Sequence, residues 1–280
     1  MKFGVLPSFE KDKDLVHTAE VCRRLLELGA SVVLPNRASD RLNLQGLVFS
    51  EEEKIYNIVD MIVVLGGDGT ILHAAKRAAS KGLPVLGINV GRLGFMAGLE
   101  PAELDRLSML VTKNYEIDSR MMLEVQVDDG PISHALNDVV ISKGAVASLI
   151  DIRVNCNTRL VGNYRADGLI VFTPTGSTAY SLSAGGPVID PEFESLGLTP
   201  ICPHSLISRT ILFSPDEQIC LYPESTGRKS YLILDGRQTA VLTSGMRVRV
   251  RRAKQKTRLV RLKDVSFYEV LNYKMNERSI

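Results

Sequence analysis

The chain has 280 residues, a formal net charge of +2, 45% apolar residues and 24% charged residues. This composition is typical of a globular protein with a core, and the near-neutral balance argues against a dedicated nucleic-acid binder, which would be strongly basic. No apolar run approaches the roughly 18 to 20 residues of a membrane-spanning helix. We expect one large or two intimate domains, with no membrane or nucleic-acid partner.

The cysteines stand far apart in the sequence and form no Cys-x-x-Cys pair. This spacing indicates that the cysteines are small buried hydrophobic side chains and not parts of a disulfide framework or a zinc site. Free thiols of this kind are typical of a reducing compartment, so we expect a cytoplasmic protein. The cysteines are Cys22, Cys156, Cys202 and Cys220.

The first third of the chain alternates predicted strands and helices. Residues 14–28 carry apolar side chains at helical spacing, and Gly29 is suited to end that helix because glycine tolerates positive φ. Residues 61–65 (MIVVL) are too apolar for a half-exposed strand and suit the buried centre of a parallel sheet. Strands separated by helices imply βαβ units, so we expect an α/β domain with a Rossmann-like parallel sheet. The other predicted elements are strands at 3–6, 30–34 and 84–89 and a helix at 70–80.

From about residue 115 the pattern changes to short, β-prone segments separated by turn residues, and only residues 177–184 look helical among them. We expect a second, β-rich and sandwich-like domain of antiparallel strands, with a boundary near residues 101–114. Residues 265–271 are apolar enough to return to the first domain. The expected divisions are 1–108, 109–262 and 263–280. The predicted strands are 122–127, 138–142, 150–156, 169–172, 211–213, 219–222 and 231–234.

A basic stretch lies near the end of the second domain. Residues 247–263 contain nine basic residues and no acidic one. The alternation of Val248, Val250 and Leu259 predicts a β-hairpin with one solvated basic face. We expect this face to help attract anionic nucleotides rather than to bind nucleic acid.

The strongest local signal is Gly-Gly-Asp-Gly-Thr at 66–70, directly between the buried strand and a helix. Its glycines let the backbone turn sharply and let a ligand approach without a Cβ in the way. The helix N-terminus behind them offers unpaired N–H groups and a favourable dipole to phosphate oxygens. The motif is neither the fingerprint G-x-G-x-x-G nor a P-loop, because the third glycine and the Gly-Lys-Ser/Thr end are missing. We expect a phosphate-binding loop here.

Asp68 stands out in this loop because a carboxylate repels phosphate. Two tasks would explain its presence: accepting a proton from an attacking hydroxyl, or organising Mg²⁺ on a polyphosphate. The alternative is a plain β-turn in which Asp68 caps the helix. The residues alone leave these roles open.

A second signal is the run TPTGSTAYSLSAGGP at 173–187, which follows an apolar strand and contains six Thr or Ser residues. It predicts another helix N-terminus with hydroxyl donors, a surface that suits ribose hydroxyls and phosphates. The alternative is a Ser/Thr-rich connecting loop with a capped helix. Just before it, Arg165 and Asp167 stand two apart in an extended segment, so we expect them on one face. One of these side chains could hold an anion while the other accepts hydrogen bonds from ribose hydroxyls or an amino group.

Together these segments resemble the NAD kinase family. The Gly-Gly-Asp-Gly-Thr loop, Asn137-Asp138 and the run at 173–187 occur in that family's order, and the resemblance covers about residues 60–240. The first motif alone would be shared with diacylglycerol and sphingosine kinases and, loosely, with phosphofructokinases, whereas the Thr/Ser run is far more discriminating. The resemblance implies ATP-dependent phosphorylation of the adenosine ribose 2′-hydroxyl of NAD, giving NADP.

The resemblance also assigns roles to residues. Asp68 matches the family's catalytic aspartate, and Phe95 matches an aromatic residue that packs near the adenine. Asn137 and Asp138 match an Asn-Glu pair that binds the dinucleotide, with a carboxylate one methylene shorter in this chain. Further substrate-binding residues expected from the motifs are Gly67, Gly69, Thr70, Arg165, Asp167, Thr178, Ala179, Tyr180, Ser181, Leu182 and Ser183.

Three further positions are expected to contact the substrates. His73 lies one turn into the helix after Asp68 and could reach the phosphates. Ser148 falls where some family members carry a histidine. Gln238 stands one place later than the glutamine of some members.

Phosphoryl transfer requires positioning, charge stabilisation, a base for the hydroxyl and Mg²⁺ on the triphosphate. We therefore expect Mg²⁺ or Mn²⁺ to enter with ATP, and no metal ion held tightly by the protein itself. The resemblance implies NAD and ATP as small-molecule substrates and a homodimer or homotetramer. It leaves open whether polyphosphate replaces ATP and whether NADH is accepted.

Two other functions stay open at this point. The first is a lipid kinase acting on diacylglycerol or a sphingoid base, which would need an apolar acceptor site, whereas the Thr/Ser run argues for a polar one. The second is a non-catalytic NAD(P)-binding regulator, against which the intact Asp68 argues.

Overall fold

The computed structural model describes residues 1–91, 94–144, 149–205, 209–224 and 229–277. The chain divides into two compact units, residues 1–119 with 257–280 and residues 120–256. The sequence suggested limits at 108 and 262 instead. The first unit extends beyond them because strands β6 (Glu116–Arg120) and β19 (Thr257–Arg261) both join its sheet.

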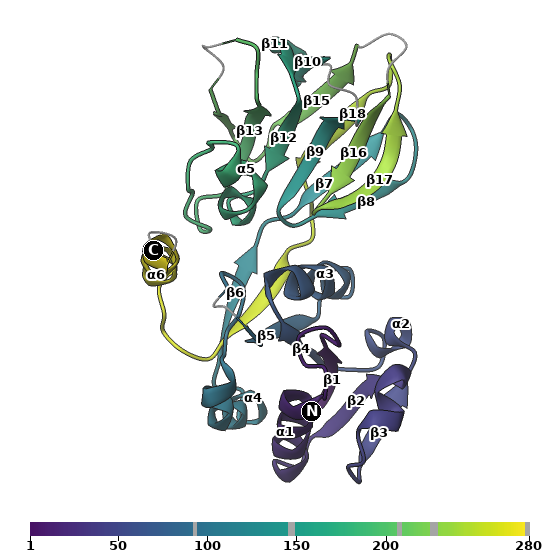
Figure 1. The fold of residues 1–280 in the computed structure, drawn as a ribbon, viewed down its shortest axis with the longest axis vertical. Coiled ribbons are helices and arrows are strands. Elements are labelled where there is room, and N and C mark those ends of the chain that lie inside the picture. Colours follow the sequence, from purple (N-terminus) through teal and green to yellow (C-terminus); the bar gives the residue numbers. More distant parts are fainter. Residues whose placement is uncertain (92–93, 145–148, 206–208, 225–228, 278–280) are drawn as a thin grey trace. The chain divides into compact units, whose positions relative to one another are not determined.

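Among the described residues, the first unit is built on a seven-stranded sheet in the order β3-β2-β1-β4-β5-β19-β6 (Figure 1). From β3 to β19 every neighbouring pair is parallel. The order 3-2-1-4-5 is that of a Rossmann-like, doubly wound fold, so the expected α/β architecture is confirmed. Its other strands are β1 (Lys2–Pro7), β2 (Ser31–Pro35), β3 (Leu47–Ser50), β4 (Met61–Gly66) and β5 (Pro84–Asn89).

Helices cover both faces of this sheet, because successive strand residues point to opposite sides. Met61, Val63 and Leu65 of β4 belong to the apolar cluster that includes α1, while Gly87 of β5 faces Ile71 of α3. All six residues of β4 are buried, which confirms the predicted central strand. The helices are α1 (Val16–Glu27), η1 (Asn36–Arg41), α2 (Glu52–Ile55), α3 (Asp68–Ala79), η2 (Pro101–Leu107), α4 (Ser108–Val111) and α6 (Phe267–Glu277).

The second unit contains two antiparallel sheets of six strands each in the described part of the chain (Figure 1). Their orders are β11-β10-β15-β18-β7-β8 and β14-β13-β12-β9-β16-β17. Inward-facing residues of both sheets, such as Val154 and Val171, share one apolar core, which is the arrangement of a β-sandwich. The predicted β-rich, sandwich-like domain is therefore confirmed.

The strands of this unit are β7 (Leu123–Val127), β8 (Ile132–Ala135), β9 (Asp138–Lys143), β10 (Ile150–Cys156), β11 (Arg159–Ala166), β12 (Gly168–Phe172), β13 (Leu196–Ile201), β14 (Ile211–Phe213), β15 (Gln218–Pro223), β16 (Ser230–Leu234), β17 (Arg237–Leu242) and β18 (Val248–Arg252). Its helices are two single turns, η3 (Thr175–Thr178) and α5 (Tyr180–Ser183).

The hairpin predicted at 247–263 is wrong. Strand β18 pairs antiparallel with β15 and β7 in the sandwich, whereas β19 pairs parallel with β5 in the first unit. The two strands thus belong to different sheets, and the chain passes from one unit to the other between them. Alternation of apolar residues predicts a strand but does not identify the strand with which it pairs.

No helix in the described part of the chain is both long and apolar enough to cross a membrane.

Candidate active site

The glycine-rich loop lies at the switch point of the parallel sheet. After β1 the chain continues to β2 on one side, and after β4 it continues to β5 on the other, although β1 and β4 are neighbours. The loops that follow β1 and β4 therefore diverge at their carboxyl ends and leave a crevice, which is where open α/β sheets bind ligands. The loop at 66–70 is one of these two loops.

Asp68 is the first residue of α3, and its carboxylate is held in place by a second loop. It accepts the backbone N–H of Phe95 at 3.0 Å and that of Met96 at 3.2 Å. A Cβ on Gly94 would collide with this carboxylate, so the sequence Gly94-Phe95 suits the contact. Asp68 thus does not act as a simple helix cap, and its orientation is set by residues far along the chain.

The glycines of the loop differ in what surrounds them. The side chain of Thr70 packs against Gly66, and the Lys11 ammonium occupies the space that a side chain on Gly67 would take. Nothing lies within 4 Å of the position of a Cβ on Gly69. Gly69 therefore borders open space beside Asp68, as a loop that admits a ligand requires.

Phe95 and His73 were the other contacts expected in this unit. The ring of Phe95 lies 6.0 Å from that of Phe267 in α6, centroid to centroid, and the Lys274 ammonium is 5.1 Å from its centroid. His73 is half-buried in α3. Helix α6 thus packs on the aromatic residue that the sequence assigns to the adenine.

In the second unit, Asn137 and Asp138 lie at the start of β9, and a carboxylate from another hairpin orders them. Asp235 accepts the N–H groups of Leu136 at 3.1 Å, Asn137 at 2.8 Å and Asp138 at 3.3 Å. Successive N–H groups that converge on one anion form a nest. Sequence reasoning missed Asp235, although the Asp-Gly pair at 235–236 is a typical hairpin turn.

Asp138 is 4% exposed. Burial, and to a smaller extent the neighbouring negative charge of Asp235, together raise the pKa of this carboxyl from 3.8 to about 7. The Asp138 carboxyl therefore changes its protonation near neutral pH.

Asn137 is joined to the Thr/Ser run by close backbone packing. Its carbonyl accepts the N–H of Thr173 at 2.9 Å and would collide with a Cβ on Gly176, so only glycine fits there. The Thr173 hydroxyl donates to the carbonyl of Leu136 at 2.6 Å. The Asn137 side-chain oxygen Oδ1 is buried and has no protein partner among the described residues. Such an orphaned acceptor marks a place for a ligand donor.

The Thr/Ser run itself differs from its prediction. Residues 177–184 do not form one helix, because Ala179 breaks the backbone between η3 and α5. Several hydroxyls face inward: Ser177 bonds to the backbone of Ile189, and the fully buried Ser181 bonds to Thr199. These hydroxyls hold the turn together, so the run presents no long helix N-terminus to a ligand. The remaining positions are half-buried (Thr178, Ala179, Leu182) or exposed (Tyr180, Ser183).

Arg165 and Asp167 take different ionic partners. The Asp167 carboxylate pairs with Lys143 at 2.5 Å, a residue that sequence reasoning missed, while Arg165 lies 3.9 Å from Asp151. The chain leaves one sheet after Ala166 and enters the other at Gly168, so the extended segment assumed for both residues ends between them. Of the two remaining expected contacts, Gln238 is exposed on β17 and Ser148 falls outside the described residues.

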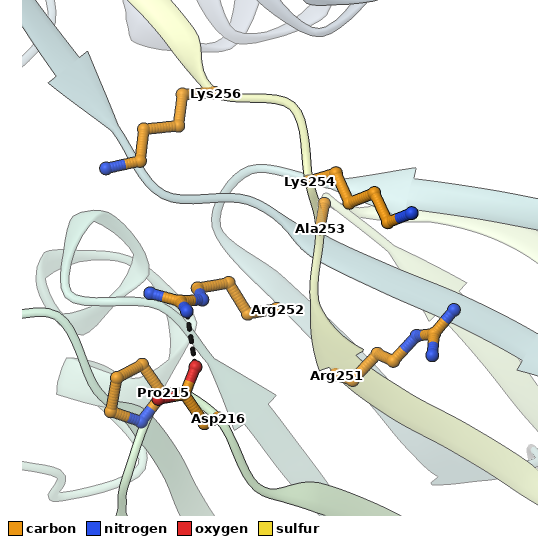
Figure 2. Close-up of a pocket in the computed structure, with 7 residues that line it drawn as sticks. All are labelled: Pro215, Asp216, Arg251, Arg252, Ala253, Lys254 and Lys256. Atoms are coloured by element: carbon orange, nitrogen blue, oxygen red, sulfur yellow. Dashed lines mark hydrogen bonds and ion pairs between the residues drawn. The ribbon is translucent and has the colours of Figure 1, made fainter.

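The basic stretch borders a hollow of about 470 Å³ in the second unit (Figure 2). Three of its cations are paired: Arg251 with Glu124, Arg252 with Glu194 and Asp216, and Lys256 with Glu194. Neighbouring carboxylates thus offset much of the positive charge, which weakens the expectation that these residues attract nucleotides. The lining residues are Pro215, Asp216, Arg251, Arg252, Ala253, Lys254 and Lys256.

Taken together, the fold and these residues define a nucleotide-dependent phosphotransferase. The first unit supplies a carboxylate at a helix start beside a glycine loop at the sheet's switch point. The second supplies a polar turn with an orphaned amide oxygen at Asn137.

The chain belongs to the ATP-NAD kinase family. The family model of the N-terminal domain matches residues 12–115, and that of the C-terminal domain matches residues 136–262. An NAD kinase of Symbiobacterium thermophilum is 42% identical over 98% of this chain and 99% of its own length. An NAD kinase of Desulforamulus reducens is 44% identical over 78% of this chain and 77% of its own length.

Two solved structures share the fold. A yeast NADH kinase complexed with NADH superposes with a TM-score of 0.90 at 25% identity, covering 99% of this chain and 87% of that one. An NAD kinase from Archaeoglobus fulgidus in complex with ATP has a TM-score of 0.76 at 27% identity, with full coverage of both chains. The lipid-kinase and regulator alternatives receive no support from these comparisons.

Proposed function

We propose that this protein transfers the γ-phosphoryl group of ATP to the 2′-hydroxyl of the adenosine ribose of NAD, giving NADP and ADP. The observation that carries this proposal is the position of the Asp68 carboxylate. Asp68 is the first residue of α3, its carboxylate accepts the backbone N–H groups of Phe95 and Met96, and the open space at Gly69 lies beside it. Family membership identifies the acceptor, and the site supplies the chemistry.

In the proposed reaction, the ribose 2′-oxygen attacks the γ-phosphorus while the bond from that phosphorus to the β,γ-bridging oxygen breaks. The hydroxyl proton passes to the Asp68 carboxylate, and the electron pair of the broken bond stays on ADP. The helix dipole and the free N–H groups at the start of α3 stabilise the charge on the transferred phosphoryl group. Most of the catalysis then comes from positioning, as is general for phosphoryl transfer.

A divalent cation fits this arrangement as part of the nucleotide complex. No group of three or more His, Cys, Asp or Glu side chains that could hold a metal ion occurs among the described residues. Mg²⁺ commonly binds through one or two carboxylates and the substrate phosphates. Asp68 is the carboxylate of the glycine loop that would contact it, and Mg²⁺ or Mn²⁺ would neutralise phosphate charge there.

On the acceptor side, we propose that Asn137 and Asp138 contact the dinucleotide. The orphaned Oδ1 of Asn137 would accept a hydrogen bond from it. Among the expected neighbours, Tyr180 and Ser183 are exposed and so accessible to a ligand, whereas Ser181 supports the turn from within.

Four finer features belong to the same proposal. The relative complexed with NADH supports testing NADH as a second acceptor. Polyphosphate is the second donor to test beside ATP. A homodimer or homotetramer is the expected assembly. The described cysteines are all free, and free thiols are typical of the reducing cytoplasm that we propose as its location.

The decisive experiment is product analysis after incubation with NAD, ATP and Mg²⁺. Wild-type protein should form NADP, and Asp68→Asn should lower the rate by about 10²- to 10⁴-fold, the usual contribution of a general base. Asp14→Asn, at an exposed position of the same unit, is the matched control and should retain activity. Near-normal NADP formation by Asp68→Asn would contradict the proposed role. Phosphorylation of a dispersed diacylglycerol or sphingoid base instead of NAD would favour a lipid kinase.

A further inference from the structure

The side chain of Lys11 lies on the glycine loop. Its Nζ occupies the space in which a side chain on Gly67 would stand, and it is 3.8 Å from the position of a Cβ on Gly91. The ammonium therefore lies between the loop that follows β4 and the loop that follows β5. The Lys11 ammonium has room there because Gly67 and Gly91 carry no side chains.

The backbone fixes the segment from which Lys11 projects. The N–H of Ser8 donates to the carbonyl of Leu65 at 2.8 Å, which ties the end of β1 to the end of β4. The N–H groups of Lys11 and Asp12 both donate to the carbonyl of Ser8, at 3.2 and 2.9 Å. This compact turn aims Lys11 across the switch point of the sheet.

Asp12 anchors the same segment to α1. Its carboxylate is 4% exposed and accepts both the backbone N–H of Thr18 at 2.8 Å and the hydroxyl of Thr18 at 2.7 Å. The negative charge of Asp12, the residue next to Lys11, is thus buried at the start of α1. Lys11 itself is exposed.

The glycine loop carries an excess of negative charge. The helix start contributes about half a positive elementary charge, which does not offset the full negative charge of Asp68. The Lys11 ammonium forms no hydrogen bond or ion pair with any of the described residues, so its charge is available to a ligand. Asn89, 2% exposed and paired with Gly66 at the end of β5, has a buried Oδ1 with no partner among the described residues. The same edge of the sheet thus carries a free cation and an orphaned acceptor.

We propose that Lys11 binds the terminal phosphates of the phosphoryl donor. This inference rests on the proposed function, because the donor's β- and γ-phosphates must lie beside the loop that holds Asp68. A lysine ammonium acts on phosphate as a point charge. It offsets the repulsion between Asp68 and the donor, and it stabilises the charge that grows on the leaving diphosphate during transfer.

The test is steady-state kinetics of Lys11→Met, which keeps the length of the side chain and removes its charge. The KM for ATP should rise about 10- to 100-fold and kcat should fall, while the KM for NAD stays within about threefold. Lys11→Arg keeps the charge and should recover much of the loss. Lys13→Met, at the next exposed lysine of the same segment, is the matched control and should behave as wild type.

A second measurement reports on phosphate binding through competition with ATP. Inorganic tripolyphosphate should inhibit wild-type protein competitively with ATP, and Lys11→Met should need a severalfold higher concentration for the same inhibition. The inference would be overturned if Lys11→Met had the same KM for ATP as the wild type, or if the substitution changed only the KM for NAD. Loss of folding in both Lys11→Met and Lys11→Gln would also overturn it, because that result would assign Lys11 a structural role. Only absence of NADP formation by the wild type would count against the proposed function itself.

Discussion

The carboxylate of Asp235 accepts the backbone N–H of Asn137 at 2.8 Å, although the two residues are 98 positions apart. Asp235 and Gly236 form the two-residue turn between β16 and β17, with φ angles of 50° and 76°. Positive φ at both positions is the requirement of a type I′ hairpin turn, which Asp-Gly satisfies. One turn residue thereby shapes the segment expected to hold the dinucleotide.

Replacing Asp235 by alanine should destabilise the second unit. Three N–H groups would lose a charged acceptor, and the free energy of unfolding should fall by about 2 to 4 kcal/mol. The KM for NAD should also rise, because Asn137 loses its support. Urea denaturation followed by circular dichroism measures the first effect. Asp129 lies in another turn of the same unit, and its side chain is 93% exposed. Asp129→Ala should therefore lower the free energy of unfolding by less than about 0.5 kcal/mol. Equal stability of the two variants would show that the nest is not needed.

The pKa of Asp138 predicts a pH dependence of stability. Burial and the Asp235 charge raise this pKa from 3.8 to about 7 in the folded chain. Between these values the folded chain binds a proton that the unfolded chain has released. The contribution to stability is therefore complete below pH 3.8 and is lost as the pH rises to about 7, by at most about 4 kcal/mol.

Asp138→Asn should remove this contribution, because asparagine does not titrate. Urea denaturation at about pH 5 and about pH 8 should show a smaller loss of stability for the variant than for the wild type, by up to about 3 kcal/mol. Asp60→Asn, at an exposed position, is a control that should retain the wild-type difference. Identical pH dependence in Asp138→Asn and wild type would refute the assignment.

Two glycines of the candidate site should respond to alanine in opposite ways. Gly176→Ala should lower the free energy of unfolding by about 3 kcal/mol, because its Cβ would collide with the carbonyl of Asn137. Gly69→Ala meets open space in α3 and should leave stability unchanged or raise it by about 0.5 kcal/mol. It should nevertheless reduce NADP formation by about tenfold or more, because its methyl group enters the space beside Asp68. Thermal unfolding and product analysis of both variants check the pair, and full activity of Gly69→Ala would show that no ligand approaches there.

Much of the first unit could be predicted because its signals are local. Residues 61–65 are apolar throughout, and β4 is the buried central strand. Gly29, two residues after the end of α1, has a φ of 76°, as its position predicts. The second unit was harder to predict in detail. Strand β11 (RLVGNYRA) is largely polar and β13 (LGLTPI) contains proline, so neither has strong strand propensity, and both are stabilised by pairing with their neighbours.

The sequence by itself predicted the chemistry of the site. Asp68 between glycines, after an apolar strand and before a helix, favours a phosphate-binding loop, and this signal is readable because all of its parts are adjacent in the chain. Only the tertiary structure decided which distant residues support that chemistry. In the structure, the Lys11 side chain lies against Gly67, and the Asp235 carboxylate accepts the N–H of Asn137. The Ser181 hydroxyl is buried against Thr199, and β18 and β19 belong to different sheets. The physical reason is that strand pairing and loop packing depend on long-range complementarity, which local periodicity does not encode.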